Sequence, residues 1–156
     1  MILLAALLIA QMTPAATDSP ILRRPPPQAF VVPPDAALIV NGGSTNFAGF
    51  KIAVERDGTA TYQQPSGVTQ GRVSAATAKW LFEHLAADRP LDKLPSGQCV
   101  KSASFGSSTT IAWGGETSPD LGCPGDARVQ ELNRTVGVIE RQLGVTAQPR
   151  NRRYIE

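Results

Sequence analysis

Residues Phe50 to Tyr62, FKIAVERDGTATY, decide the fold, because their pattern predicts a β-hairpin with one apolar face. A two-residue turn at Asp57-Gly58 would split the apolar side chains between the two faces. A three-residue loop, Arg56 to Gly58, places the glycine at positive φ and keeps the apolar side chains together. We predict this loop because burial of one face strongly specifies register. The apolar face then holds Phe50, Ile52, Val54, Ala60 and Tyr62.

The other face of the predicted hairpin is polar. Its residues are Lys51, Glu55, Thr59 and Thr61, with only Ala53 small and apolar among them. One polar face is typical of an antiparallel sheet, and the apolar face of such a sheet needs a helix to cover it.

Two amphipathic helices are predicted to provide this cover. Ser74 suits an N-cap, and Pro90 disfavours helix beyond Asp88, so the first helix spans residues 75–87. The second spans residues 127–143, between an Asp126 cap and Gly144. Their apolar stripes are Ala78, Leu81, Phe82 and Leu85 in the first, and Val129, Leu132, Val136, Ile139 and Leu143 in the second.

Shorter apolar or β-branched runs complete the sheet. We predict strands at residues 36–40, 68–73 and 107–113, with residues 116–121 pairing back in a second hairpin. The fold class expected is therefore α+β, with a single antiparallel sheet of about five to six strands packed against two helices. The order of elements is roughly β-β-β-β-α-β-β-α.

The N-terminus has the pattern of a signal peptide. Residues 2–10 are an unbroken apolar run that is too short to cross a hydrocarbon core of roughly 30 Å, and small residues follow at 13–16. No Lys or Arg precedes the run. We expect residues 1–16 to be a signal peptide cleaved after Ala15 or Ala16. The mature bacterial protein would be periplasmic or secreted and would have no transmembrane segment.

The mature chain divides into three parts by composition and charge. Residues 17–34 contain six of the thirteen prolines and are expected to form an extended tether. Residues 35–144 form the expected globular domain, with ten Lys or Arg against eleven Asp or Glu. Residues 145–156 are expected to be a flexible basic tail. Because the domain is nearly neutral, we expect no nucleic-acid partner and at most weak contact of the basic ends with an anionic envelope surface.

The two cysteines, Cys99 and Cys123, flank the second predicted hairpin. An even count in an exported chain predicts a disulfide, which in the entropic model contributes roughly 3.5 kcal/mol for a loop of about 25 residues. Free buried thiols are the alternative. Two cysteines and a single histidine make a poor metal site, and we expect neither a metal nor a cofactor.

No set of residues in the sequence predicts catalysis. His84 lies four residues after Trp80, a spacing typical of a surface pair on a helix. The serines at 104, 107 and 108 lack a G-x-S-x-G context. Two carboxylate pairs, Glu55 with Asp57 and Glu116 with Asp120, lie around predicted hairpins. We expect a non-enzymatic binding or interaction module with an envelope protein or ligand as partner. The alternative is a small periplasmic hydrolase that uses carboxylates or His84.

The arrangement also resembles a family of short exported bacterial domains of unknown function, over about residues 37–143. The resemblance implies export and an α+β layer but no known reaction. Members often carry Cys-Phe-Gly-x-Cys-Pro before the first hairpin strand, whereas residues 44–50 here contain no cysteine, so a function tied to those cysteines is not implied. The matching residues are Asp57-Gly58-Thr59, Tyr62, Gly71, Ser74, Leu81-Phe82 and the stripe from Leu132 to Leu143.

Overall fold

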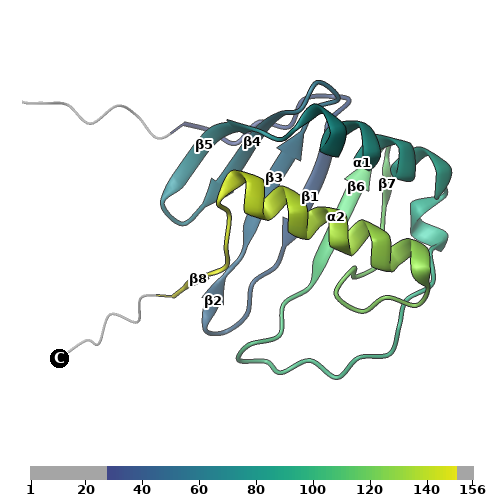
Figure 1. Ribbon diagram of the computed structural model, residues 1–156. Coiled ribbons are helices and arrows are strands. Elements are labelled where there is room, and N and C mark those ends of the chain that lie inside the picture. Colours follow the sequence, from purple (N-terminus) through teal and green to yellow (C-terminus); the bar gives the residue numbers. More distant parts are fainter. Residues whose placement is uncertain (1–27, 151–156) are drawn as a thin grey trace, which may run out of the picture.

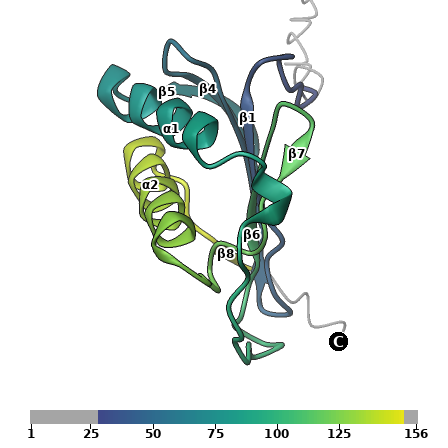
Figure 2. The same cartoon turned by 90° about the vertical axis from the view of Figure 1, so that its right-hand side faces the viewer.

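The computed structural model describes residues 28–150 and has the predicted α+β class. The expected signal peptide, the tether up to residue 27 and the chain after residue 150 lie outside the described residues. A six-stranded antiparallel sheet has the order β5-β4-β3-β1-β6-β7, and both helices cover the same face of it (Figures 1 and 2).

The main sheet consists of β1 (Ala37–Asn41), β3 (Phe50–Val54), β4 (Thr59–Gln64), β5 (Gly67–Arg72), β6 (Thr109–Trp113) and β7 (Glu116–Thr117). The helices are α1 (Ala75–Ala87) and α2 (Ala127–Leu143), and a short 3₁₀ helix, η1 (Leu91–Lys93), follows α1. A small second sheet pairs β2 (Phe47–Ala48) with β8 (Gln148–Pro149).

The β3–β4 hairpin has the predicted register. Val54 pairs with Ala60 and Ile52 with Tyr62, and Gly58 has a φ of 87°. Glu55 N–H donates to the Thr59 carbonyl at 2.8 Å, which closes the three-residue loop. The strands therefore direct their apolar side chains to the helical layer, as burial of one face requires.

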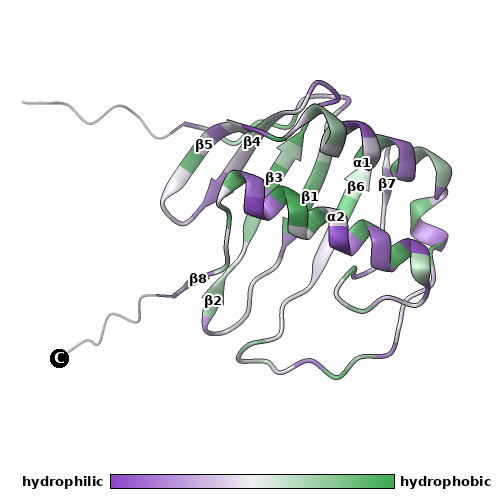
Figure 3. Cartoon of the chain, in the orientation of Figure 1, coloured by the Kyte–Doolittle hydropathy of each residue, from purple (hydrophilic) through white to green (hydrophobic). Residues whose placement is uncertain are grey.

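Both helices begin and end as the sequence predicts. The Ser74 hydroxyl accepts from Thr77 N–H at 3.1 Å, and the Asp126 carboxylate accepts from Val129 N–H at 3.1 Å. Gly144 ends α2 with a φ of 64°, a conformation that glycine adopts without strain. Figure 3 shows the apolar segments of β1 and β3 behind the helices. The predicted stripes lie in this core except for Leu143, which is only partly buried.

Within residues 28–150, no helix lies over the second face of the sheet (Figure 2). Leu38 of β1, Ala53 of β3 and Thr61 of β4 lie side by side in register on this face. Ala53 is only 1% exposed, although the other predicted polar-face residues remain exposed or half-buried. Residues 28–36 lie on this side, near the end of the sheet that carries the β3–β4 loop (Figures 1 and 2).

Two segments differ from the sequence predictions. The strand expected at residues 116–121 ends at Thr117, because Pro119 has no N–H to continue the ladder. The chain after Gly144 does not begin as a free tail. Val145 is buried and Gln148–Pro149 pairs with β2, so the boundary expected at residue 144 lies too early. Burial of an apolar valine and the hydrogen bond from Arg150 Nε to the Ser44 carbonyl, at 3.0 Å, hold this segment.

Candidate functional site

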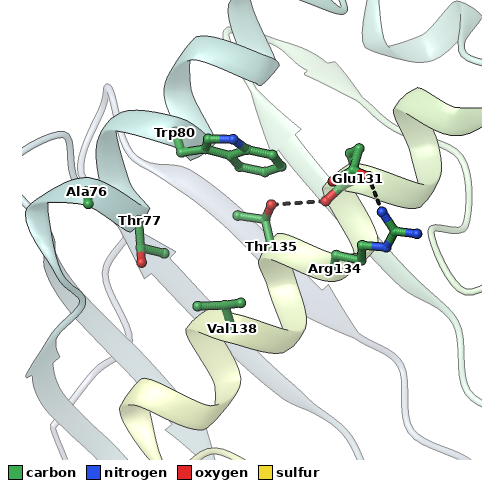
Figure 4. A pocket seen from close by; sticks show the side chains of 7 residues that line it. All are labelled: Ala76, Thr77, Trp80, Glu131, Arg134, Thr135 and Val138. Atoms are coloured by element: carbon green, nitrogen blue, oxygen red, sulfur yellow. Dashed lines mark hydrogen bonds and ion pairs between the residues drawn. The ribbon is translucent and has the colours of Figure 1, made fainter.

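A groove of about 350 Å³ opens to solvent between α1 and α2, on the side away from the sheet (Figure 4). It lies outside the apolar stripes that pack the two helices on the strands. Small side chains near the start of α1 leave the space, and one large aromatic ring borders it. The residues that line the groove are Ala76, Thr77, Trp80, Glu131, Arg134, Thr135 and Val138.

Trp80 is the dominant side chain of the groove. It is half-buried, and its ring extends from α1 over Thr135 of α2 (Figure 4). On α1 it stacks with His84, one helical turn later, with ring centroids 3.8 Å apart and an interplanar angle of 38°. The indole thus has a partner on its own helix and also borders an open cavity.

The polar groups of the groove are mostly engaged locally. The Thr135 hydroxyl donates to the Glu131 carbonyl at 2.9 Å, and Thr77 Oγ1 accepts from Gln142 Nε2 at 3.1 Å. Glu131 and Arg134 form an ion pair on the exposed side of α2. The groove therefore offers an apolar interior and a charged rim, a combination typical of sites that bind an apolar group and orient it by a few polar contacts.

The sequence pattern did not indicate this groove, although it singled out Trp80 and His84. Glu131, Thr135 and Val138 have the i, i+4, i+7 spacing of one helix face, and Ala76 and Trp80 have an i, i+4 spacing on the other helix. These positions flank the predicted core stripes. Only the packing of α1 beside α2 shows that the two flanks meet.

His84 has a carboxylate neighbour but does not line the groove. Its Nδ1 lies 3.9 Å from Asp88 Oδ2, and its side chain is 34% exposed. The serines considered as nucleophiles lie elsewhere: Ser107 accepts from Asn41, and the Ser104 carbonyl accepts from Ser44. Within residues 28–150, the side chain of His84 contacts Trp80 and lies near Asp88. Trp80 and His84 thus form the surface pair on one helix that their spacing predicts.

Asp57 of the Glu55–Asp57 pair does not have the pKa of a glycosidase general acid. The backbone N–H of Thr59 at 2.8 Å is the main cause of a lowered pKa of Asp57, and Arg72 adds to it. A general acid needs a raised pKa. Asp57 therefore stays ionised and holds the β3–β4 loop.

The second carboxylate pair is also used by the fold. The side chain of Arg89 donates to Glu116 and lowers its pKa, with help from Leu91 N–H at 2.9 Å. Burial raises the pKa of Asp120, but hydrogen bonds from Lys101, Thr109 and Gly122 outweigh it and lower the pKa overall. Neither carboxylate has the raised pKa of a general acid.

Cys99 and Cys123 lie at disulfide distance, as the sequence predicts. Their Cα atoms are 5.8 Å apart, within the range that a disulfide spans. No group of three or more potential metal ligands occurs among residues 28–150. In the same residues, no helix has the length and apolar character needed to cross a membrane.

Comparisons with family models, with curated proteins and with solved structures found no match to this chain.

Proposed function

We propose that the protein is an exported bacterial binding module that holds a segment of a partner protein in the groove between α1 and α2. The observation that carries this proposal is the position of Trp80, which borders an apolar groove that is open to solvent. Tryptophan and arginine are, with tyrosine, the residues enriched at binding hot spots, and here Trp80 and Arg134 line one groove. A groove of this size accommodates one or two apolar side chains of a partner.

Export is supported by the apolar N-terminal run and by the cysteine pair at disulfide distance. Residence in the periplasm or outside the cell, and kinship with the short exported bacterial domains described above, belong to the same proposal. Mass spectrometry of protein recovered from the periplasm should find a chain that begins near residue 16 and has no free thiol. A retained N-terminus in the membrane fraction, or two free thiols per chain, would contradict export.

A hydrolase is the alternative that the sequence left open. A hydrolase needs a nucleophile or a general acid, and it needs a cavity in which that group contacts the substrate. In its candidate carboxylate pairs, the pKa values of Asp57, Glu116 and Asp120 are lowered, whereas a general acid needs a raised pKa. His84 lies beside the groove, and its side-chain neighbours within the described residues are Trp80 and Asp88. These observations support a binding module over a hydrolase.

Site-specific photo-crosslinking tests the groove directly. A photoreactive phenylalanine analogue is placed at Val138 in the groove, and in a matched protein at Gln70, an exposed position on β5 opposite Thr61 and thus on the helix-free face. Irradiation in the expressing cell envelope should give a discrete adduct from position 138 and none from position 70. Equal labelling from both positions, or none from position 138, would refute the groove as the binding site.

A further inference from the structure

Three segments far apart in the sequence meet at one end of the molecule (Figures 1 and 2). They are residues 42–49, which include β2, residues 99–108 before β6, and residues 145–150, which include β8. Thr45 N–H donates to the Ala103 carbonyl at 3.1 Å, and Arg150 N–H donates to the Asn46 carbonyl at 2.8 Å. We call this end the loop end.

The loop end exposes two large apolar side chains. Val100 is fully exposed and Phe105 is 69% exposed, and both lie on the segment 99–108. Phe105 also packs beside the half-buried Phe47, with ring centroids 6.1 Å apart. The two exposed side chains and the half-buried Phe47 ring give the loop end an apolar surface that a partner or a membrane can contact.

The loop that carries these residues is held in place. Lys101 Nζ donates to the Ser107 carbonyl at 2.6 Å and forms an ion pair with Asp120. Gly106 N–H donates to the Ser102 carbonyl at 2.6 Å, and Cys99 begins the loop at the cysteine pair. Val100 and Phe105 are therefore presented by an ordered support, which lowers the entropic cost of contact with a partner.

The three segments of the loop end contain no Asp or Glu of their own. Lys101 and Arg150 are basic, and Asp120, outside the segments, pairs with Lys101, so Arg150 carries the net positive charge there. Arg150 is exposed, and the sequence continues after it with Arg152 and Arg153. Nine of the other positions carry hydroxyl or amide side chains: Ser44, Thr45, Asn46, Ser102, Ser104, Ser107, Ser108, Thr146 and Gln148. Such a surface attracts anionic groups and supplies hydrogen bonds to them.

We propose that the loop end contacts an anionic lipid bilayer, with Val100 and Phe105 inserted among the headgroups and the exposed Arg150 on the anionic surface. A stable protein interface buries about 800 Å² on each partner. Two isolated side chains on one loop offer much less apolar surface than that. A fluid bilayer accepts such a protrusion without a matching shape, and basic residues strengthen binding to anionic lipid.

Vesicle flotation tests this proposal with the chain from Thr17 onward, which contains the whole described fold and lacks the apolar N-terminal run. The probes are vesicles of phosphatidylcholine alone and vesicles with about one third phosphatidylglycerol. Binding is expected to the anionic vesicles, and it should weaken when the salt concentration rises. Equal binding to both kinds of vesicle would refute the proposal. So would the absence of binding to the anionic vesicles by protein that a cooperative thermal melt shows to be folded.

Matched variants distinguish vesicle binding through the loop end from nonspecific binding through any exposed apolar residue. Phe105→Ser should lower the partition coefficient about tenfold, because the inserted apolar area is lost. Val31→Ser, which alters an exposed valine in the segment at the opposite end, should leave it unchanged. If Val31→Ser weakens binding as much as Phe105→Ser, the loop end is not the contact.

A charge variant tests the electrostatic part. Ala103 is exposed in the loop, and Ala29 is exposed in the opposite segment. Ala103→Asp should weaken binding to anionic vesicles about fivefold, and Ala29→Asp should not. Sedimentation completes the test: a dimer that Phe105→Ser dissociates, without any vesicle binding, would assign the loop end to a second copy of the chain and overturn the lipid proposal.

Discussion

The two tryptophans of this chain have contrasting surroundings. Trp113, at the end of β6, packs edge-on against Phe82, with centroids 5.9 Å apart, and the guanidinium groups of Arg56 and Arg89 lie 5.3 and 5.7 Å from its ring centre. Glu116 holds Arg89 in place through hydrogen bonds of 3.1 and 2.6 Å. Trp80 instead stacks with His84 and borders an open groove.

This difference separates a tryptophan that serves folding from one that is available for binding. The neighbours of Trp113 come from α1 and from the loops that carry Arg56 and Arg89, and together they cover part of its ring. The groove beside Trp80 leaves room for groups from another molecule. Exposure alone would not distinguish the two residues, because both are half-buried.

The largest effect is expected where a side chain is fully enclosed. Val54 is 0% exposed on the helix-covered face of the sheet, whereas Thr61 of β4 lies on the helix-free face. Val54→Asp buries a carboxylate without a partner and should cost more than about 4 kcal/mol of unfolding free energy. Thr61→Asp should cost about 1 kcal/mol or less. Thermal melts of both variants measure this, and equal losses would overturn the assignment of the two faces.

The tryptophans themselves should give the next largest difference. Trp113→Ala removes a ring packed on Phe82 together with its two cation–π contacts, and we expect a loss of about 2–3 kcal/mol. Trp80→Ala removes a groove residue and should cost about 1 kcal/mol or less. Urea unfolding curves of the two variants measure these losses of unfolding free energy. If Trp80→Ala destabilised the protein as much as Trp113→Ala, Trp80 would be a folding residue and the comparison would fail.

A smaller effect is expected at low pH, where acrylamide should quench the fluorescence of Trp113 more strongly and that of Trp80 no differently. Glu116 has a lowered pKa in the folded protein, so its stabilising contacts are complete above its ordinary pKa of about 4.3. These contacts are lost as the pH falls through the lowered pKa that Glu116 has in the folded protein. Arg89 then loses its hydrogen bonds to the Glu116 carboxylate. Acrylamide quenching of Trp113, measured in Trp80→Phe, should increase as the pH falls below about 4. Quenching of Trp80, measured in Trp113→Phe, should stay constant until the protein unfolds.

The matched control for this titration is Glu116→Gln, which keeps the size of the side chain but removes its charge. In this variant, also carrying Trp80→Phe, quenching of Trp113 should no longer depend on pH over that range. A pH dependence that persisted in Glu116→Gln would assign the effect to another carboxylate. Asp57, Asp120 and Asp126 also have lowered pKa values, and they contribute to acid sensitivity with the same sign.

Sequence pattern predicted the elements that local chemistry determines. The hairpin register follows from one apolar face and Gly58, and the helix limits follow from Ser74, Asp126 and Gly144. Pro119 interrupts the strand expected to pair back over residues 116–121. The segment after Gly144 docks through β2, and no periodic pattern indicates that contact.

The candidate site was less accessible to sequence reasoning for a related reason. Trp80 and His84 share one helix, so their i, i+4 spacing indicates a pair. Thr135 and Val138 join the groove only through the placement of α2 beside α1, which depends on tertiary packing. The contacts of Trp113 with Arg56 and Arg89 likewise connect residues far apart in the sequence.

The central claim is that a partner protein binds the groove through Trp80. Its most direct test is the yield of the photo-adduct from position 138 in Trp80→Ala, with Trp113→Phe as the matched tryptophan control and thermal melts of both proteins. We expect at least about a tenfold loss of adduct in Trp80→Ala, because a hot-spot side chain is removed, and an unchanged yield in Trp113→Phe. An adduct of full yield from a folded Trp80→Ala protein would contradict it.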